Sequence, residues 1–109
     1  EPLYLHIARK VDEWNKKDNA GLVVGATHLN ELERVRQLCP TLPFLIPGAG
    51  AQGGDFEAAV RIGAGPSWDL AIINSSRSII YASAGKNFGE AAAREAESLC
   101  QQMHKARNR

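Results

Sequence analysis

The sequence predicts an α/β fold in which helices alternate with parallel strands. Three short apolar runs are each followed by a polar or glycine-rich turn and then by an amphipathic helical pattern. Near-continuous apolar strands separated by helices are typical of parallel β/α units with right-handed crossovers. Three strands cannot close a barrel, which in this class needs eight strands and roughly 250 residues. The pattern therefore predicts either a small open three-layer sheet or part of a larger β/α barrel.

Composition limits the class further. The 109 residues allow one domain, and 44% hydrophobic with 23% charged residues is ordinary for a soluble globular protein. A formal net charge of +1 gives no indication of a positively charged surface that would bind nucleic acid or an anionic membrane. No run has the length of a membrane span and no signal peptide is recognisable, so we expect a cytoplasmic protein. Cys39 and Cys100 lie far apart in the sequence, and free thiols are expected.

The start of the chain favours the barrel alternative. The first residue is Glu1, and the only methionine is Met103. We therefore expect a fragment or a processed product of a longer protein.

The first helix is predicted from an apolar repeat, and the polar run 15–19 ends it. The repeat has spacings of four, four and three, which place its members on one helical face: Leu3, Ile7, Val11 and Trp14. The run 21–26 that follows predicts a strand buried on both faces.

A second helix follows, with Thr27 or Asn30 as its cap and Cys39-Pro40 as its end. Its predicted apolar face comprises Leu32, Val35 and Leu38. The second strand is 44–46, and Asp55 is expected to cap the next helix, 56–62. The predicted inner face of that helix comprises Phe56, Ala59 and Val60. The run 63–66 ends it.

The third strand is predicted at 69–73, before a polar turn at 74–78 and a short helical turn at 79–82. Asn87 and Glu90 resemble a capping box that begins the last helix. The predicted inner face of this helix comprises Phe88, Ala92, Glu95 or Ala96, Leu99 and Met103.

The segment 47–55 is the most distinctive in the chain. It holds four of the ten glycines within seven residues, directly between a strand and a helix. Backbone N–H groups and the helix dipole at such a junction can hold an anion. The spacing matches neither a Walker loop nor a clean dinucleotide fingerprint. It predicts either a phosphate or carboxylate site or merely a tight strand-to-helix turn.

In a β/α barrel, the loops after the second and third strands would lie on the ligand-binding face. Arg77 could then supply a bidentate fork to a phosphate, or it could be a solvated surface cation. Gln52 could bridge a phosphate and a polar ring, or it could brace its own loop. Ser76 and Arg77 would add backbone N–H groups if a helical turn starts there. His28 opens a helix next to the first loop of the C-terminal face and could approach a site.

Four segments together resemble the orotidine 5'-phosphate decarboxylase family, in its longer bacterial branch. They are 21–27, 31–36, 45–55 and 73–82. They cover nearly all of the chain, in order and at the spacing of the family.

The resemblance implies that the chain is the C-terminal part, about three β/α units, of a TIM (β/α)8 barrel in an enzyme of pyrimidine biosynthesis. It implies that Gln52 contacts both phosphate and pyrimidine and that Arg77 clamps the 5'-phosphate, with the amide of Ser76 or Arg77 beside it. The substrate-pocket residues implied are Pro47, Gly48, Ala49 and Gly53. The family also implies a homodimer and no metal or cofactor.

The chain departs from the family in its catalytic groups. Family members use an Asp-x-Lys-x-x-Asp motif on an earlier strand and a further upstream lysine, and this sequence contains no such motif. Lys16, Lys17 and Asp18 are adjacent and have the wrong spacing. We therefore assign no catalytic residue here and expect the chain alone to be inactive. The expected partners are orotidine or uridine 5'-phosphate and the missing N-terminal part of the barrel. Two alternatives are a non-catalytic phosphate-binding fragment and another phosphate-binding barrel enzyme.

Overall fold

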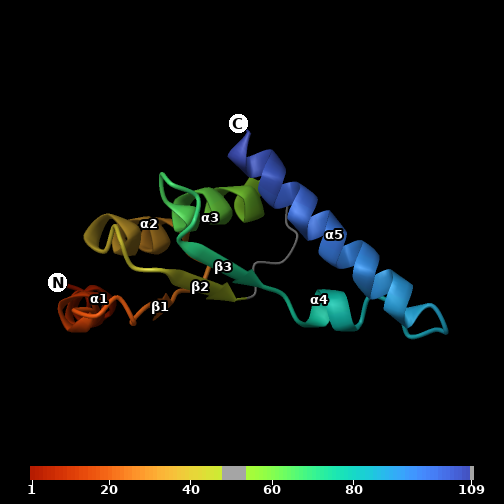
Figure 1. The fold of residues 1–109 in the computed structure, drawn as a ribbon, viewed down its shortest axis with the longest axis horizontal. Helices are drawn as coiled ribbons and strands as arrows, with labels where there is room; N and C mark the ends of the chain where they lie inside the picture. The colour runs from red at the N-terminus through yellow and green to blue at the C-terminus, as the bar shows by residue number, and fades with distance from the viewer. Residues whose placement is uncertain (48–53, 109) are drawn as a thin grey trace.

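The computed structural model describes residues 1–47 and 54–108 (Figure 1). Its elements, in chain order, are α1 (Leu3–Trp14), β1 (Leu22–Val23), α2 (Leu29–Leu38), β2 (Phe44–Pro47), α3 (Gly54–Ala64), β3 (Ala71–Asn74), α4 (Arg77–Ile80) and α5 (Phe88–Arg107). The predicted alternation of helices and strands is confirmed. The helical turn predicted at 79–82 begins earlier, as α4. No helix in the described part of the chain is both long and apolar enough to cross a membrane.

The three strands form one parallel sheet in the order β1-β2-β3. Phe44 pairs with Leu22 on one side and with Ala71 on the other, and Pro47 pairs with Asn74. Each pair of neighbouring strands is joined through a helix, as parallel strands require. The β/α units predicted from the sequence are therefore present.

The core lies between the sheet and the helices α2 and α3, which cover one of its faces (Figure 1). Phe44 and Ile46 alternate along β2 and are fully buried on this face. The inner face predicted for α3 is confirmed, because its three residues are all buried. The largest fully buried side chains are Phe44, Phe56, Leu32, Leu42, Ile46 and Cys39.

The opposite face of the sheet is apolar and exposed. Val23, Leu45 and Ile72 form one row across the three strands, and the outer two are 71% and 61% exposed. The prediction that the first strand is buried on both faces is therefore wrong. The strand has only two residues, and within the described residues no second layer covers this face.

The helix α1 has the predicted bounds. Of the four residues on its predicted apolar face, only Val11 packs against the core. Leu5 and Ala8 are buried against the core, whereas Ile7 is 51% exposed and Leu3 and Trp14 are more exposed still. The apolar residues of α1 form two adjacent stripes. The side toward α2 buries only one of them, so the other remains exposed.

Several helix ends differ from the sequence-based expectation. His28, rather than Thr27 or Asn30, is the N-cap of α2, and its side chain makes no capping hydrogen bond. The helix α3 begins at Gly54, so Asp55 lies in its first turn rather than at its cap. A carboxylate in the first turn still interacts favourably with the helix dipole.

The capping box predicted at the start of α5 does not form. Asn87 is the N-cap, but its Oδ1 accepts a hydrogen bond from the Ser83 hydroxyl at 2.6 Å and caps no helical N–H. Phe88 is exposed, while Leu99 is buried as predicted. The predicted ends of α2 at Cys39 and of α3 near Gly65 are confirmed, with Gly65 in the left-handed conformation at φ 71°.

Arg36 is a buried arginine at the amino ends of the strands. Its Nη1 donates to the carbonyls of Cys39 at 3.0 Å and Leu42 at 2.7 Å. Its Nη2 donates to the carbonyls of Gly63 at 2.5 Å and Leu70 at 3.3 Å. The guanidinium also lies 3.6 Å from the centre of the Phe44 ring. Arg36 thus joins the ends of α2 and α3 to the starts of β2 and β3.

The exposed sheet face and the outer edges of β1 and β3, which pair with no strand in the described part of the chain, predict that the chain associates in solution. Contiguous apolar surface and free strand edges drive proteins together. Sedimentation of the isolated chain should therefore reveal dimers or larger species that dissociate on dilution. A monodisperse monomer at all concentrations would contradict this expectation.

Candidate functional site

The carboxyl ends of β2 and β3 lie side by side. Pro47 ends β2, Asn74 ends β3, and the two residues are partners in the sheet register. The segments that follow the two strands therefore leave the sheet at the same edge. In parallel α/β folds, ligands bind at this edge. The geometry supports the sequence-based choice of these two segments.

The structure describes three of the predicted site residues. Pro47 is half-buried at the end of β2, and Ser76 and Arg77 are exposed at the start of α4. The other predicted residues lie outside the described residues: Gly48, Ala49, Gln52 and Gly53. Pro47 lies at the end of β2, and Ser76 and Arg77 follow the end of the neighbouring strand β3. The contacts of these three residues with a ligand remain predictions.

A helical turn begins at Ser76 and Arg77, as the proposed use of their backbone requires. The Ser76 carbonyl accepts from the Ile80 N–H at 2.8 Å, and the Arg77 carbonyl accepts from the Tyr81 N–H at 2.9 Å. The N–H groups of a first helical turn have no partner within the helix. The hydroxyls of Ser75 and Ser78 hydrogen-bond to each other across this turn. Arg77 is thus exposed on a helical turn that follows the end of β3.

Asn74 is a polar residue at this edge whose importance the sequence reasoning missed. Its Oδ1 is buried and has no hydrogen-bond partner among the described residues. An unsatisfied buried acceptor costs roughly 1–3 kcal/mol. The sequence offered one signal, an amide residue at the end of an apolar strand directly before the serine and arginine of the predicted site. Within the described residues, the Asn74 Oδ1 is thus a buried acceptor without a partner, three residues before Arg77 in the sequence.

A polar depression of about 400 Å³ lies further along the same edge, after β1. It is lined by residues 26–31 and by Asp55. His28 is exposed here, so it reaches the strand-end side of the sheet as expected. Among the residues that the structure describes, no group of three His, Cys, Asp or Glu side chains could hold a metal ion.

The perturbed titratable groups lie at the other end of the sheet. Burial lowers the pKa of Arg36, and burial also raises the pKa of the Cys39 thiol. The Cys39 Sγ donates to the Ala8 carbonyl at 3.5 Å. Both cysteines are free, and Cys100 is exposed. These pKa shifts arise from core packing and not from the strand-end site.

Solved structures define the class of the fold. The chain superposes on a Leishmania donovani OMP decarboxylase with a TM-score of 0.74 and 33% identity, over 95% of this chain and 40% of that one. It also superposes on a Leishmania donovani UMP synthase with a TM-score of 0.72 and 37% identity, over 93% of this chain and 22% of that one. The fold is therefore part of a TIM (β/α)8 barrel.

Curated relatives then identify the family. Orotidine 5'-phosphate decarboxylase of Dehalococcoides mccartyi is 48% identical over 107 residues, which are 98% of this chain and 40% of the relative. The Polaromonas naphthalenivorans enzyme of the same name is 59% identical over 95 residues, 86% of this chain and 33% of the relative. No protein-family model matches.

The chain belongs, over the part that it spans, to the orotidine 5'-phosphate decarboxylase family. It spans 33–40% of the length of these two relatives. The resemblance read from the sequence is thereby confirmed, and the coverage agrees with a C-terminal portion of the family.

Proposed function

We propose that this chain is the phosphate- and pyrimidine-binding part of an orotidine 5'-phosphate decarboxylase. The intact enzyme converts orotidine 5'-phosphate to uridine 5'-phosphate and carbon dioxide. The observation that carries this proposal is the register of Pro47 with Asn74. It brings the end of the strand before the glycine segment beside the end of the strand before the Arg77 turn. The identity to decarboxylases over nearly the whole chain supports it.

In this proposal the chain binds substrate, and other residues of the barrel carry out the bond cleavage. The Arg77 guanidinium forms two charge-assisted hydrogen bonds to the 5'-phosphate, and the amide of Ser76 or Arg77 adds a further donor. Gln52 contacts both phosphate and pyrimidine, and Pro47 with its neighbours 48, 49 and 53 lines the base pocket. Binding energy from the phosphate is used to hold the pyrimidine in its reactive position.

The acid that protonates C6 as carbon dioxide leaves is not in this chain. The family carries that group in the Asp-x-Lys-x-x-Asp motif, which the sequence lacks. The chain alone is therefore proposed to be inactive, and its partners are the rest of the barrel and, for the intact enzyme, a second subunit. The intact enzyme is proposed to be cytoplasmic.

The mass of the source polypeptide tests the proposal at once. A parent of barrel size with the Asp-x-Lys-x-x-Asp motif upstream of Glu1 supports the decarboxylase. A native product of 109 residues would instead favour a non-catalytic phosphate-binding module.

Ligand competition distinguishes the decarboxylase from another phosphate-binding barrel. We expect the intact protein to bind uridine 5'-phosphate at least about tenfold more tightly than ribose 5-phosphate, because only the nucleotide adds hydrogen bonds from the pyrimidine. Isothermal titration with both ligands measures this ratio. Equal affinities would show that the pocket recognises phosphate without the base, which contradicts the proposed substrate.

A further inference from the structure

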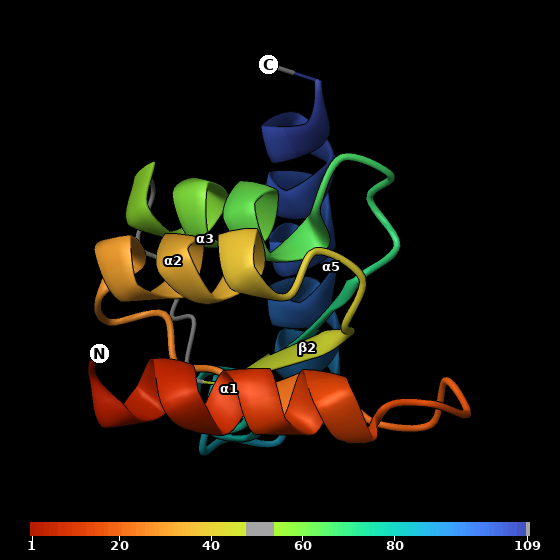
Figure 2. The same cartoon turned by 90° about the vertical axis from the view of Figure 1, so that its left-hand side faces the viewer.

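Asn74 lies on the face of the sheet that no helix in the described part of the chain covers. The helices α2 and α3 pack side by side over the opposite face (Figure 2). Ala71 and Ile73 of β3 pack against the core on that side, whereas Ile72 is 61% exposed. Successive side chains of a strand point to opposite faces of a sheet. The side chain of Asn74 therefore lies on the same face as Ile72.

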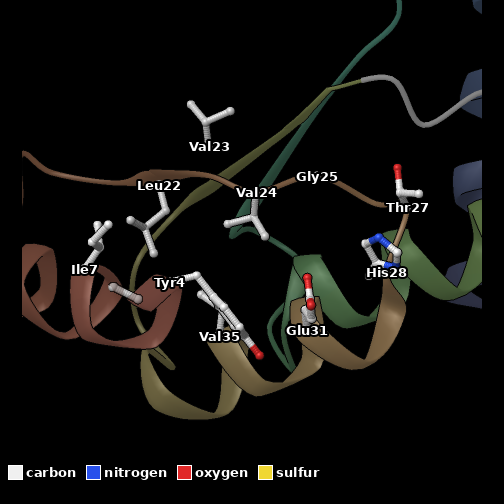
Figure 3. A pocket seen from close by; sticks show the side chains of 11 residues that line it. Tyr4, Ile7, Leu22, Val23, Val24, Gly25, Thr27, His28, Glu31 and Val35 are labelled. Atoms are coloured by element: carbon white, nitrogen blue, oxygen red, sulfur yellow. The ribbon is translucent and has the colours of Figure 1, made fainter. Parts of the chain in front are cut away.

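This open face corresponds to the inside of a complete barrel. Helices form the outer ring of a TIM barrel, and its interior is filled by layers of mainly Val, Ile and Leu side chains. The row of Val23, Leu45 and Ile72 suits such a layer, and Val23 points away from the helices (Figure 3). The next row toward the carboxyl ends of the strands pairs Pro47 with Asn74. A polar side chain thus follows an apolar interior layer, at the end of the barrel where ligands bind.

The side-chain oxygen of Asn74 has no partner in its own turn. Its Oδ1 is buried and accepts no hydrogen bond from the described residues. Ser76 is the N-cap of α4 without a side-chain capping bond, and the hydroxyls of Ser75 and Ser78 bond to each other. Buried polar atoms without a partner are rare, so this oxygen indicates a donor from outside the described residues. Because χ2 of asparagine is broad, the amide can turn its oxygen toward such a donor without a change of the backbone.

The chemistry of a nucleotide limits which of its groups can be that donor. A phosphate monoester is largely dianionic at neutral pH and offers acceptor oxygens. The phosphate therefore suits the donors of Arg77 and not the oxygen of Asn74. The nucleoside part carries the donors, which are the pyrimidine N3–H and the ribose hydroxyls. Pro47, the neighbour of Asn74 in the sheet, lines the base pocket in the proposed function.

We propose that Asn74 is a further substrate-binding residue, whose Oδ1 accepts a hydrogen bond from the nucleoside part of the nucleotide while Arg77 holds the phosphate. The inference rests on the proposed function for the identity of the ligand. It assigns the two ends of the ligand to two residues that are three positions apart in the sequence. Asn74 then contributes to the affinity for the nucleoside and not to the affinity for the phosphate.

Ligand binding by an Asn74→Leu variant of the intact protein tests this inference. Leucine has nearly the same size as asparagine but no acceptor. We expect isothermal titration to show about 5- to 30-fold weaker binding of uridine 5'-phosphate, because one hydrogen bond is lost and a donor of the ligand is left unpaired. The affinity for inorganic phosphate should change less than about twofold, because the contacts of Arg77 remain.

Three analogues that each lack one donor identify the group that Asn74 binds. They are N3-methyluridine 5'-phosphate, 2'-deoxyuridine 5'-phosphate and 3'-deoxyuridine 5'-phosphate. The variant and the unsubstituted protein should bind one of the three with equal affinity, since the hydrogen bond is then absent from both complexes.

Asn19→Leu is the matched control for the same chemical change. Asn19 is exposed in the loop before β1, at the amino ends of the strands. Its substitution should change the affinity for uridine 5'-phosphate less than about twofold. Circular dichroism verifies that the variants fold. If leucine at position 74 disturbs the fold, Asn74→Ala removes the acceptor without adding bulk, and the same result is expected.

The outcomes separate this inference from the proposed function. Equal affinity of the Asn74 variant and the unsubstituted protein for uridine 5'-phosphate overturns the inference and leaves the proposed function standing. An equal loss for uridine 5'-phosphate and all three analogues also overturns it, because the partner of the oxygen is then a group of the protein. If binding of uridine 5'-phosphate depends on Asn74 but the protein does not decarboxylate orotidine 5'-phosphate, the inference stands and the proposed function is contradicted.

Discussion

Arg77→Ala in the intact protein is expected to lower kcat/KM for orotidine 5'-phosphate roughly 10- to 150-fold. The substitution removes charge-assisted hydrogen bonds to the phosphate, which contribute about 1.5–3 kcal/mol. The side chain is exposed at the start of α4, so its removal should leave the fold intact. Steady-state kinetics measures the effect.

Three comparisons make this prediction specific. Arg61→Ala removes an exposed arginine from the last turn of α3 and should change kcat/KM less than about twofold. Arg77→Lys keeps the charge but loses the bidentate geometry. Its kcat/KM should therefore lie between the values of Arg77→Ala and of the unsubstituted protein. With orotidine, which lacks the phosphate, the parent and Arg77→Ala should be equally slow. An unchanged kcat/KM for the phosphorylated substrate would remove Arg77 from the phosphate site.

Arg36→Met is expected to lower the free energy of unfolding by about 3 kcal/mol or more. The substitution removes the donor to four backbone carbonyls, of which the Leu70 carbonyl keeps the hydrogen bond from the Phe44 N–H. Each buried acceptor that is left unpaired costs about 1–3 kcal/mol before relaxation. Methionine keeps the apolar part of the side chain near Phe44. Urea unfolding followed by circular dichroism, at one fixed protein concentration, measures the change.

Arg34→Met is the matched control on the same helix. Arg34 is exposed, and its Nη1 donates only to the Tyr4 hydroxyl at 3.1 Å among the hydrogen bonds that the structure describes. Loss of such a surface contact should cost less than about 1 kcal/mol. Equal destabilisation by the two substitutions would mean that the carbonyl cluster does not depend on Arg36.

The strands and the inner face of α3 were predictable because both depend on local periodicity. Apolar runs specified β2 and β3, and the spacing of Phe56, Ala59 and Val60 specified the buried side of the helix. The inner face of α1 was not predictable, since two apolar stripes compete and the position of the neighbouring α2 decides between them. Ile7, on the second stripe, lines a groove together with residues of β1 and α2.

Arg36 illustrates what a single sequence cannot reveal. Its four carbonyl partners come from three separate stretches of chain, and only folding brings them together. At the site, the position of Arg77 followed from the order of strand and turn, and the structure places it at the expected edge. The unpaired oxygen of Asn74 depends on how tightly neighbouring residues enclose it, which no spacing in the sequence encodes.

Turnover of orotidine 5'-phosphate tests most directly whether this chain is the substrate-binding part of a decarboxylase whose catalytic residues lie in the rest of the barrel. The assay compares the chain alone, the unmatched part of the Dehalococcoides mccartyi enzyme alone, and the two refolded together. We predict uridine 5'-phosphate and carbon dioxide only from the combination, and little from a combination that carries Arg77→Ala. Turnover by the chain alone, or a stable complex without turnover, would contradict the account.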